Sequence, residues 1–322
     1  MAKKKIGIGK VIRNIVLSFI VLCMMWVIFH TGMKLYEENK YPATGEYIDL
    51  EGEKLHVTTK GEGEKTIVLL PGLGTTAPAL DFEPLMNELA KDFQVVVVEP
   101  FGYGWSDLTK RERTVENIVE EVRTALQTAQ IEGPYILMPH SLAGIYSMYY
   151  ANKYPEEIEA VVGIDPTLPQ ALEYFNEAAP KMPSYFSFIA PTGLARLALL
   201  VNAENSLPLA EEGTYSHGNL AMTKAISAWK GYNKNIVEEA NKIEENAEKT
   251  KDLSFPAQLP VLIFMKEDDK VTDDGKSMES FYEQQLNAVN NQRLVTLKGH
   301  HYLHWKNYKK MTEEIKSFAD SF

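Results

Sequence analysis

Residues 135–144 read Tyr-Ile-Leu-Met-Pro-His-Ser-Leu-Ala-Gly, and this stretch decides the fold that we expect. The apolar run that ends at Met138 predicts a buried strand, and the run from 142 to 150 predicts a helix. A strand that turns directly into a helix holds the residue at the bend in a strained conformation, with its side chain directed out of the sheet. Ser141 occupies this bend and is therefore a candidate nucleophile. The alternative interpretation is an ordinary helix with Ser141 as its N-cap.

Strand-like and helix-like segments alternate on both sides of this stretch. Predicted strands, most of them buried apolar runs as in a parallel sheet, occur at 66–70, 94–98, 135–138, 160–164, 261–265 and 293–297. A hairpin over 46–60 precedes them. This alternation predicts an α/β fold with a mostly parallel central sheet and helices on both faces. Residues 166–257 contain no convincing strand and predict a helical insertion. Functional residues are expected at the carboxyl ends of the strands.

Composition and charge narrow the class of protein. The chain has 322 residues, of which 45% are apolar and 24% are charged, as in a globular protein. Its net charge is −11, and the first thirteen residues carry five cations, so the rest carries −16 (−11 − 5). An acidic body without a basic stripe argues against binding to nucleic acid.

An apolar segment follows the basic N-terminus. Residues 15–29 correspond to about 22 Å of helix, and residues 11–31 to about 30 Å, the thickness of a bilayer core. A cleaved signal peptide and a buried core helix are the alternatives to a membrane anchor. No small-x-small cleavage pattern follows the run, which favours an uncleaved anchor. Cys23, the only cysteine, lies within this segment, so no intramolecular disulfide is possible.

These features predict the domain organisation. Residues 1–10 form a basic cytoplasmic segment, and residues 11–33 a transmembrane signal anchor. Residues 34–45 form a linker, and residues 46–322 the α/β domain with its helical insertion at about 166–257. Upstream lysines place the N-terminus in the cytoplasm and the body outside the cell membrane. We expect the anchor to contribute nothing to the core of the body.

Several motifs resemble those of the α/β-hydrolase superfamily. Residues 139–144 (Pro-His-Ser-Leu-Ala-Gly) look like its nucleophile elbow, usually Gly-His-Ser-x-Gly-Gly. Residues 71–74 (Pro-Gly-Leu-Gly) are similar to its His-Gly-x-Gly oxyanion loop, and residues 99–106 to its Asp-x-x-Gly-x-Gly-x-Ser loop. The insertion at 166–257 lies where the family inserts its cap. The departures from the family pattern are Pro71, Pro139 and Ala143.

The resemblance implies a catalytic triad with Ser141 as the nucleophile. The family's Gly-His pattern falls on residues 299–305, where His301 is preferred as the base, His300 is the alternate and His304 supports the site. Residues 266–269 (Lys-Glu-Asp-Asp) resemble the family's Gly-Glu-x-Asp, which implies Asp269 as the acid. Asp268 and then Asp165, at the end of an earlier strand, are the alternates.

An acyl transfer also needs donors for the oxyanion that develops in the transition state. The resemblance implies the backbone N–H groups of Leu73 and Leu142. We expect no cofactor and no metal, because the clustered histidines occur without the matching carboxylate of a metal site.

The predicted function is that of a membrane-anchored serine hydrolase that cleaves a carboxylic ester, with a small-molecule or lipid-like substrate. A proline-iminopeptidase-like aminopeptidase would use the same triad. A catalytically silent α/β-hydrolase scaffold that binds a ligand is the alternative from another class.

Overall fold

The computed structural model describes residues 7–201, 207–268 and 270–322. Its centre is an eight-stranded sheet in the order β1-β2-β4-β3-β5-β6-β7-β8. The strands are β1 (Glu46–Leu50), β2 (Glu53–Lys60), β3 (Thr66–Leu70), β4 (Gln94–Glu99), β5 (Tyr135–Pro139), β6 (Ile158–Ile164), β7 (Val261–Lys266) and β8 (Gln292–Leu297). Only β1–β2 and β2–β4 pair antiparallel; the other neighbours are parallel. The predicted mostly parallel α/β sheet is confirmed.

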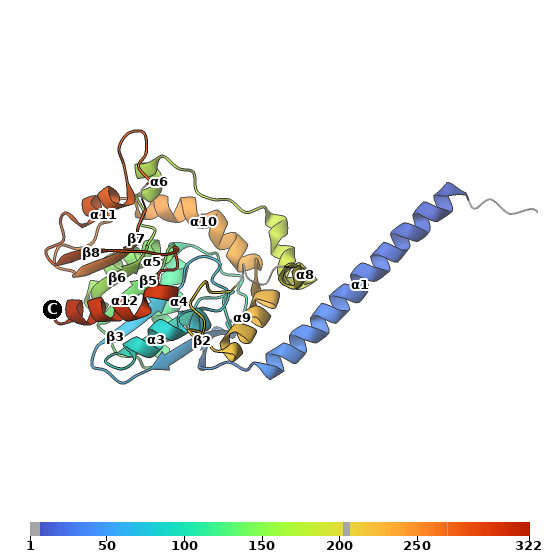
Figure 1. Ribbon diagram of the computed structural model, residues 1–322, viewed down its shortest axis with the longest axis horizontal. Coiled ribbons are helices and arrows are strands. Elements are labelled where there is room, and N and C mark those ends of the chain that lie inside the picture. The colour runs from blue at the N-terminus through green and yellow to red at the C-terminus, as the bar shows by residue number, and fades with distance from the viewer. Residues whose placement is uncertain (1–6, 202–206, 269) are drawn as a thin grey trace, which may run out of the picture.

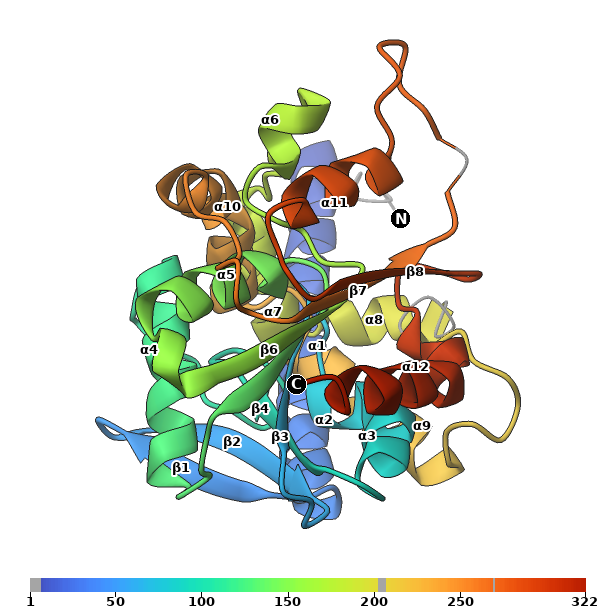
Figure 2. The same ribbon diagram turned by 90° about the vertical axis from the view of Figure 1, so that its left-hand side faces the viewer.

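Helices cover both faces of this sheet (Figure 2). One face packs against α4 (Val115–Thr128), α5 (Ala143–Lys153) and α11 (Met278–Leu286). The other packs against α2 (Pro78–Asp81), α3 (Glu83–Leu89) and α12 (His304–Ala319). Every residue of β3 and β5 is buried, because side chains on both faces of these strands meet a helical layer. A short 3₁₀ turn, η1 (Pro155–Glu157), leads into β6.

The helical insertion lies between β6 and β7, where the sequence predicts a cap. Its elements are α6 (Ala171–Phe175), η2 (Ser184–Phe188), α7 (Ile189–Thr192), α8 (Leu194–Val201), α9 (His217–Lys230) and α10 (Lys234–Thr250). Figure 1 places α8, α9 and α10 on the side of the body that faces the N-terminal helix. Caps at the N-termini of α9 and α10 are supplied by Ser216 and Asn233, whose side chains accept backbone N–H groups.

A buried carboxylate joins the cap to the core. Glu239 of α10 accepts hydrogen bonds from the hydroxyls of Tyr103 and Tyr146, each at 2.8 Å. Burial raises the pKa of Glu239, and the nearby Arg113 opposes that rise. Burial also holds the pKa of both tyrosines well above the usual value, so their hydroxyls remain donors.

The N-terminal helix is longer than the predicted anchor. Helix α1 runs from Ile8 to Lys40, through most of the segment that we expected to be a linker. It is the one helix of the described residues that is, by itself, long and apolar enough to cross a membrane. It projects from the body as a single rod (Figure 1). However, its residues His30 and Glu37 are buried against the cap. The segment thus contacts the cap through Arg196, although among the described residues no residue of α1 belongs to the hydrophobic core on either face of the sheet.

The raised pKa of Glu239 predicts a pH-dependent stability. The folded state binds the Glu239 proton more tightly than the unfolded chain, so stability should fall as pH rises from about 4.3, the ordinary Glu pKa, through the folded value. Glu239→Gln keeps the shape and remains neutral. The melting temperature of Glu239→Gln minus that of the wild type should therefore be larger at pH 8 than at pH 5, as measured by thermal unfolding at both pH values.

Glu244→Gln on the same helix is the control, because Glu244 is exposed beside Lys181. It should follow the wild type at both pH values. Equal pH responses of Glu239→Gln and the wild type would contradict this account of the buried carboxylate.

Candidate functional site

The turn from β5 into α5 has the strained geometry that the sequence predicts. Ser141 has a φ of 52°, in the left-handed region that non-glycine residues rarely adopt. Hydrogen bonds to the segment after β6 hold it there: its N–H donates to Ile164 O at 3.1 Å, and its carbonyl accepts Thr167 N–H at 2.7 Å. Ser141 is half-buried at the carboxyl edge of the sheet. The bend is thus an elbow and not a simple helix cap.

Two glycines permit the close packing of this elbow. A Cβ on Gly72 would lie 2.7 Å from His140 Nδ1 and 2.9 Å from Ser141 Cβ. A Cβ on Gly144 would lie 2.6 Å from the carbonyl oxygen of Thr167. The loop after β3 and the loop after β6 therefore press against the serine from two sides.

A histidine and an aspartate meet beside this elbow. His301, in the loop after β8, contacts Asp165, directly after β6, with 2.5 Å between Nδ1 and Oδ2. The backbone N–H of Lys266 donates to the other carboxylate oxygen, Oδ1, at 3.3 Å. The Asp165 side chain is 11% exposed and that of His301 is 37% exposed, so the imidazole lies at the opening of the site. Asp165 also has a positive φ, 43°.

The other histidines of this region have different surroundings. His300 is exposed and stacks on Trp305, with 5.6 Å between ring centroids and 2° between planes. His304 is buried, and its Nε2 lies 2.7 Å from Asp81 Oδ2. His140, next to the serine, is buried, and burial holds its pKa well below the usual value, so it remains neutral. Of these histidines, His301 is the one that contacts Asp165.

The predicted acids lie on the loop after β7. Asp269 lies outside the described residues. Asp268 pairs with Lys266 at 3.0 Å, and this hydrogen bond lowers the pKa of Asp268. Among the residues that the structure describes, Asp165, our third choice, is the carboxylate that contacts His301. The available sequence signal was its position directly after a buried strand, where a side chain reaches the carboxyl edge of the sheet.

The predicted oxyanion donors lie on two adjacent loops. Residues 72–75 form a turn in which Thr75 N–H donates to Gly72 O at 3.2 Å and Gly74 has a φ of 78°. Within the described residues, the N–H groups of Leu73 and Leu142 have no protein acceptor.

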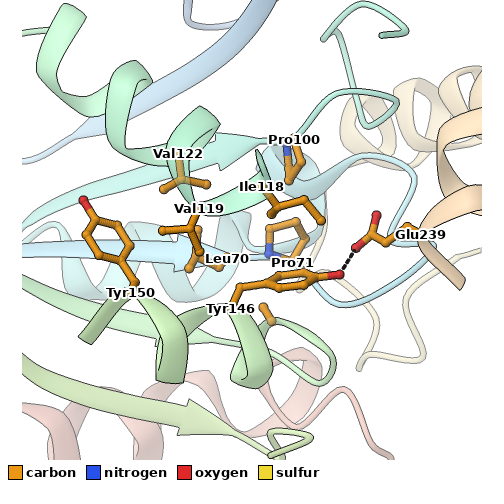
Figure 3. Close-up of a pocket in the computed structure, with 10 residues that line it drawn as sticks. Leu70, Pro71, Pro100, Ile118, Val119, Val122, Tyr146, Tyr150 and Glu239 are labelled. Carbon is orange, nitrogen blue, oxygen red and sulfur yellow. Dashed lines mark hydrogen bonds between the residues drawn. The ribbon is translucent and has the colours of Figure 1, made fainter. Parts of the chain in front are cut away.

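A small apolar cavity lies beside the elbow, between α4 and α5 (Figure 3). Pro71, Ala143, Tyr146 and Glu239 are among the residues that line it. Its volume of about 10 Å³ admits about one water molecule. Its lining does not include Ser141, Asp165 or His301, so it is not the pocket in which these three side chains would act. Among the described residues, no group of three or more His, Cys, Asp or Glu side chains is placed to hold a metal ion.

Comparisons with known proteins agree with this architecture. A family model described as alpha/beta hydrolase fold matches residues 65–308. The chain is 30% identical over 232 residues to the protein YbdG of Bacillus subtilis (strain 168), covering 72% of this chain and 70% of that protein. It is 34% identical over 127 residues to the serine hydrolase BPHL of Mus musculus, covering 37% of this chain and 42% of that protein.

Solved structures share the fold at low identity. The enol-lactonase from Burkholderia xenovorans LB400 superposes with a TM-score of 0.60 and 18% identity, covering 85% of this chain and 100% of that chain. The epoxide hydrolase VrEH1 from Vigna radiata has a TM-score of 0.66 and 16% identity, covering 86% and 97%. At these identities, the similarity concerns the fold alone.

The packing of the elbow predicts the effect of adding one methyl group. Gly144→Ala should lower the free energy of unfolding by about 1–3 kcal/mol, because the new Cβ meets a backbone oxygen that side-chain rotation cannot remove. Chemical denaturation measures this change.

Gly218→Ala in α9 is the matched control, because its Cβ would have its nearest neighbour at 3.7 Å. In a helix, this change should be neutral or stabilising by at most about 1 kcal/mol. If both variants lose the same stability, the close approach at Gly144 does not constrain the elbow.

Proposed function

Because the chain belongs to the α/β-hydrolase family, we propose that it is a membrane-anchored serine hydrolase that cleaves a carboxylic ester through an acyl-enzyme. The observation that carries this proposal is the contact between Asp165 and His301 beside the strained Ser141. A nucleophile at an elbow, a histidine and a carboxylate that orients the histidine are the components of a serine hydrolase site. A scaffold that only binds a ligand has no need of this combination.

The proposed reaction begins with proton transfer from Ser141 to His301. Since the Nδ1–H of His301 donates to Asp165, its Nε2 is the nitrogen free to accept the serine proton. The serine oxygen attacks the ester carbonyl, and the N–H groups of Leu73 and Leu142 stabilise the oxyanion. His301 then returns the proton to the leaving alcohol. A water molecule, activated by the same imidazole, releases the acid and regenerates the serine.

We propose Asp165 as the acid in place of Asp269, which lies outside the described residues. Asp165 has two acceptor bonds that fix its position: one from Lys266 N–H and one from His301. A carboxylate held by a backbone donor keeps the imidazole in one orientation and tautomer, which is the role of the acid in a triad. Asp268 already pairs with a lysine side chain.

The membrane part of the proposal rests on helix α1. Its apolar segment is exposed and carries no charge between Arg13 and Lys34, which suits a bilayer core. The basic residues before it favour a cytoplasmic N-terminus, with the catalytic body on the other side of the cell membrane. A lipid-like ester is then a substrate within reach of the body.

A fluorophosphonate probe tests the nucleophile. It should react covalently with the purified wild-type chain at Ser141, because the elbow and base activate this hydroxyl. Peptide mapping by mass spectrometry locates the adduct, and Ser141→Ala is the control that should remain unlabelled. Absence of the adduct from the folded wild type would favour the ligand-binding scaffold. Faster turnover of aminoacyl anilides than of esters would favour the aminopeptidase.

Substitutions distinguish the proposed triad from its alternates. His301→Ala should lose at least about 10³-fold in kcat on an ester substrate, and Asp165→Asn about 10²- to 10⁴-fold. His300→Ala, which removes an exposed stacked ring, should lose no more than about tenfold, or about 1.4 kcal/mol. Steady-state kinetics on folded variants measures these losses.

Asp268→Asn is the matched control for Asp165→Asn, because it makes the same chemical change on the neighbouring loop. If Asp165→Asn remained active while Asp269→Asn was inactive, the acid of the triad would be Asp269, on the loop after β7. If His301→Ala remained active and His300→Ala lost its activity, His300 would be the base instead of His301.

A further inference from the structure

One arginine of the cap forms hydrogen bonds to helix α1. Arg196 of α8 donates from its two terminal nitrogens to the two carboxylate oxygens of Glu37, at 2.7 and 2.6 Å. Its Nε donates to His30 Nδ1 at 3.2 Å. All three side chains are buried. A two-pronged arginine–carboxylate bond in a buried place fixes orientation as well as distance, so α8 is held against α1 in a defined pose.

The turn before α8 also contacts α1. Gly193 has a φ of 75°, and a Cβ on it would lie 2.5 Å from His30 Cγ. The imidazole therefore rests directly on the backbone of the turn between α7 and α8. His30 and Glu37 are seven residues apart, which places them two turns apart on one face of α1.

These contacts coincide with the end of the uncharged part of α1. Residues 14–33 carry no charged side chain and correspond to about 30 Å of helix, the thickness of a bilayer core. The end of this stretch, at Met33, lies between the two residues that Arg196 binds. If α1 crosses a bilayer, as proposed above, α8 is attached at the level of the bilayer surface.

Helix α8 presents an apolar surface at this level. Leu194, Leu197, Leu200 and Val201 are exposed, whereas Arg196 and Leu199 of the same helix are buried. Leu194, Leu197 and Leu200 follow one another at intervals of three, and Val201 lies four positions after Leu197, so the four form one stripe. Tyr185 and Phe188 of η2, shortly before it in the chain, are also exposed. Figure 1 shows α8 beside α1, where the rod leaves the body.

We propose that the exposed stripe of α8 is a membrane-docking surface that lies among the lipid headgroups of the bilayer that α1 crosses. This inference rests on the membrane anchor of the proposed function. When exposed apolar side chains next to a membrane-spanning helix enter the boundary between headgroups and acyl chains, the free energy of the system falls, because apolar surface leaves water. The body is then held against the bilayer by two elements, α1 and α8.

The docked pose bears on the class of substrate. Helix α9 packs on α8, and its Ser227 hydroxyl lies 2.7 Å from that of Thr76 in the loop after β3. One helix thus separates the lipid-facing stripe from the loop that carries Leu73. A cap in this position would lie where an ester with a long acyl chain is held at the bilayer surface.

Fluorescence quenching in vesicles tests the docking surface with the full-length chain. An environment-sensitive fluorophore is attached to Leu200→Cys in a Cys23→Ala background, in vesicles of phosphatidylcholine and phosphatidylglycerol. Lipids brominated near the headgroup should quench it about twofold, since an interfacial helix buries its apolar face in that region. Asp320→Cys is the control, because Asp320 is also exposed. It directly follows α12, and Figure 1 places this end of the chain on the far side of the body from α1 and α8, so a fluorophore there should not be quenched.

The native Cys23, labelled in the wild type, reports on the anchor separately, because it lies in the middle of the uncharged stretch. Quenching at Cys23 by lipids brominated deep in the acyl chain, without quenching at Leu200→Cys, would overturn the docking surface alone. Absence of quenching at both would overturn the anchor as well. A blue-shifted Leu200→Cys spectrum that brominated lipids do not quench would mean that protein, such as a second copy, covers α8, and would also overturn the proposal.

Discussion

The hydrogen bond between His301 and Asp165 depends on how three loops meet at the carboxyl edge of the sheet. Ser141 and Asp165 follow neighbouring strands, β5 and β6, and both have a positive φ. The backbone bonds of Ser141 to Ile164 and Thr167 lock these two strained residues together. Strain of this kind persists only where the surroundings over-determine it, and here two helical layers and a closely packed glycine supply that constraint.

Much of this arrangement was predictable from the sequence, for a physical reason. Strands buried on both faces appear as continuous apolar runs, and the elbow appears as such a run that stops at a serine before a helix. The acid was not predictable in the same way, because β6 and β7 are adjacent and both are followed by aspartates. The reach of His301 across the end of β7 to Asp165 depends on strand order and loop shape, which local sequence does not encode. The continuation of α1 beyond Met33 was missed because polar residues there suggested a linker, whereas Glu37 is buried by a partner 159 residues away.

The cap is bonded both to the region of the elbow and to the N-terminal helix. Through Glu239 it is bonded to tyrosines beside the elbow, and through Arg196 it is bonded to the N-terminal helix. Both contacts use buried ionisable groups, which are costly to bury unless they are hydrogen-bonded or paired, and which therefore favour one arrangement over looser ones. A single helical insertion thus connects the elbow, with the residues that we propose as the triad, to the helix that we assign to the membrane.

The bond between Asp165 and His301 is the central claim, and proton NMR observes it most directly. A strongly hydrogen-bonded imidazole N–H gives a resonance far downfield, and the one that disappears in His301→Ala is assigned to this residue. The account predicts that this resonance persists in Asp269→Asn and disappears in Asp165→Asn. Its persistence in Asp165→Asn, together with its loss in Asp269→Asn, would contradict the account.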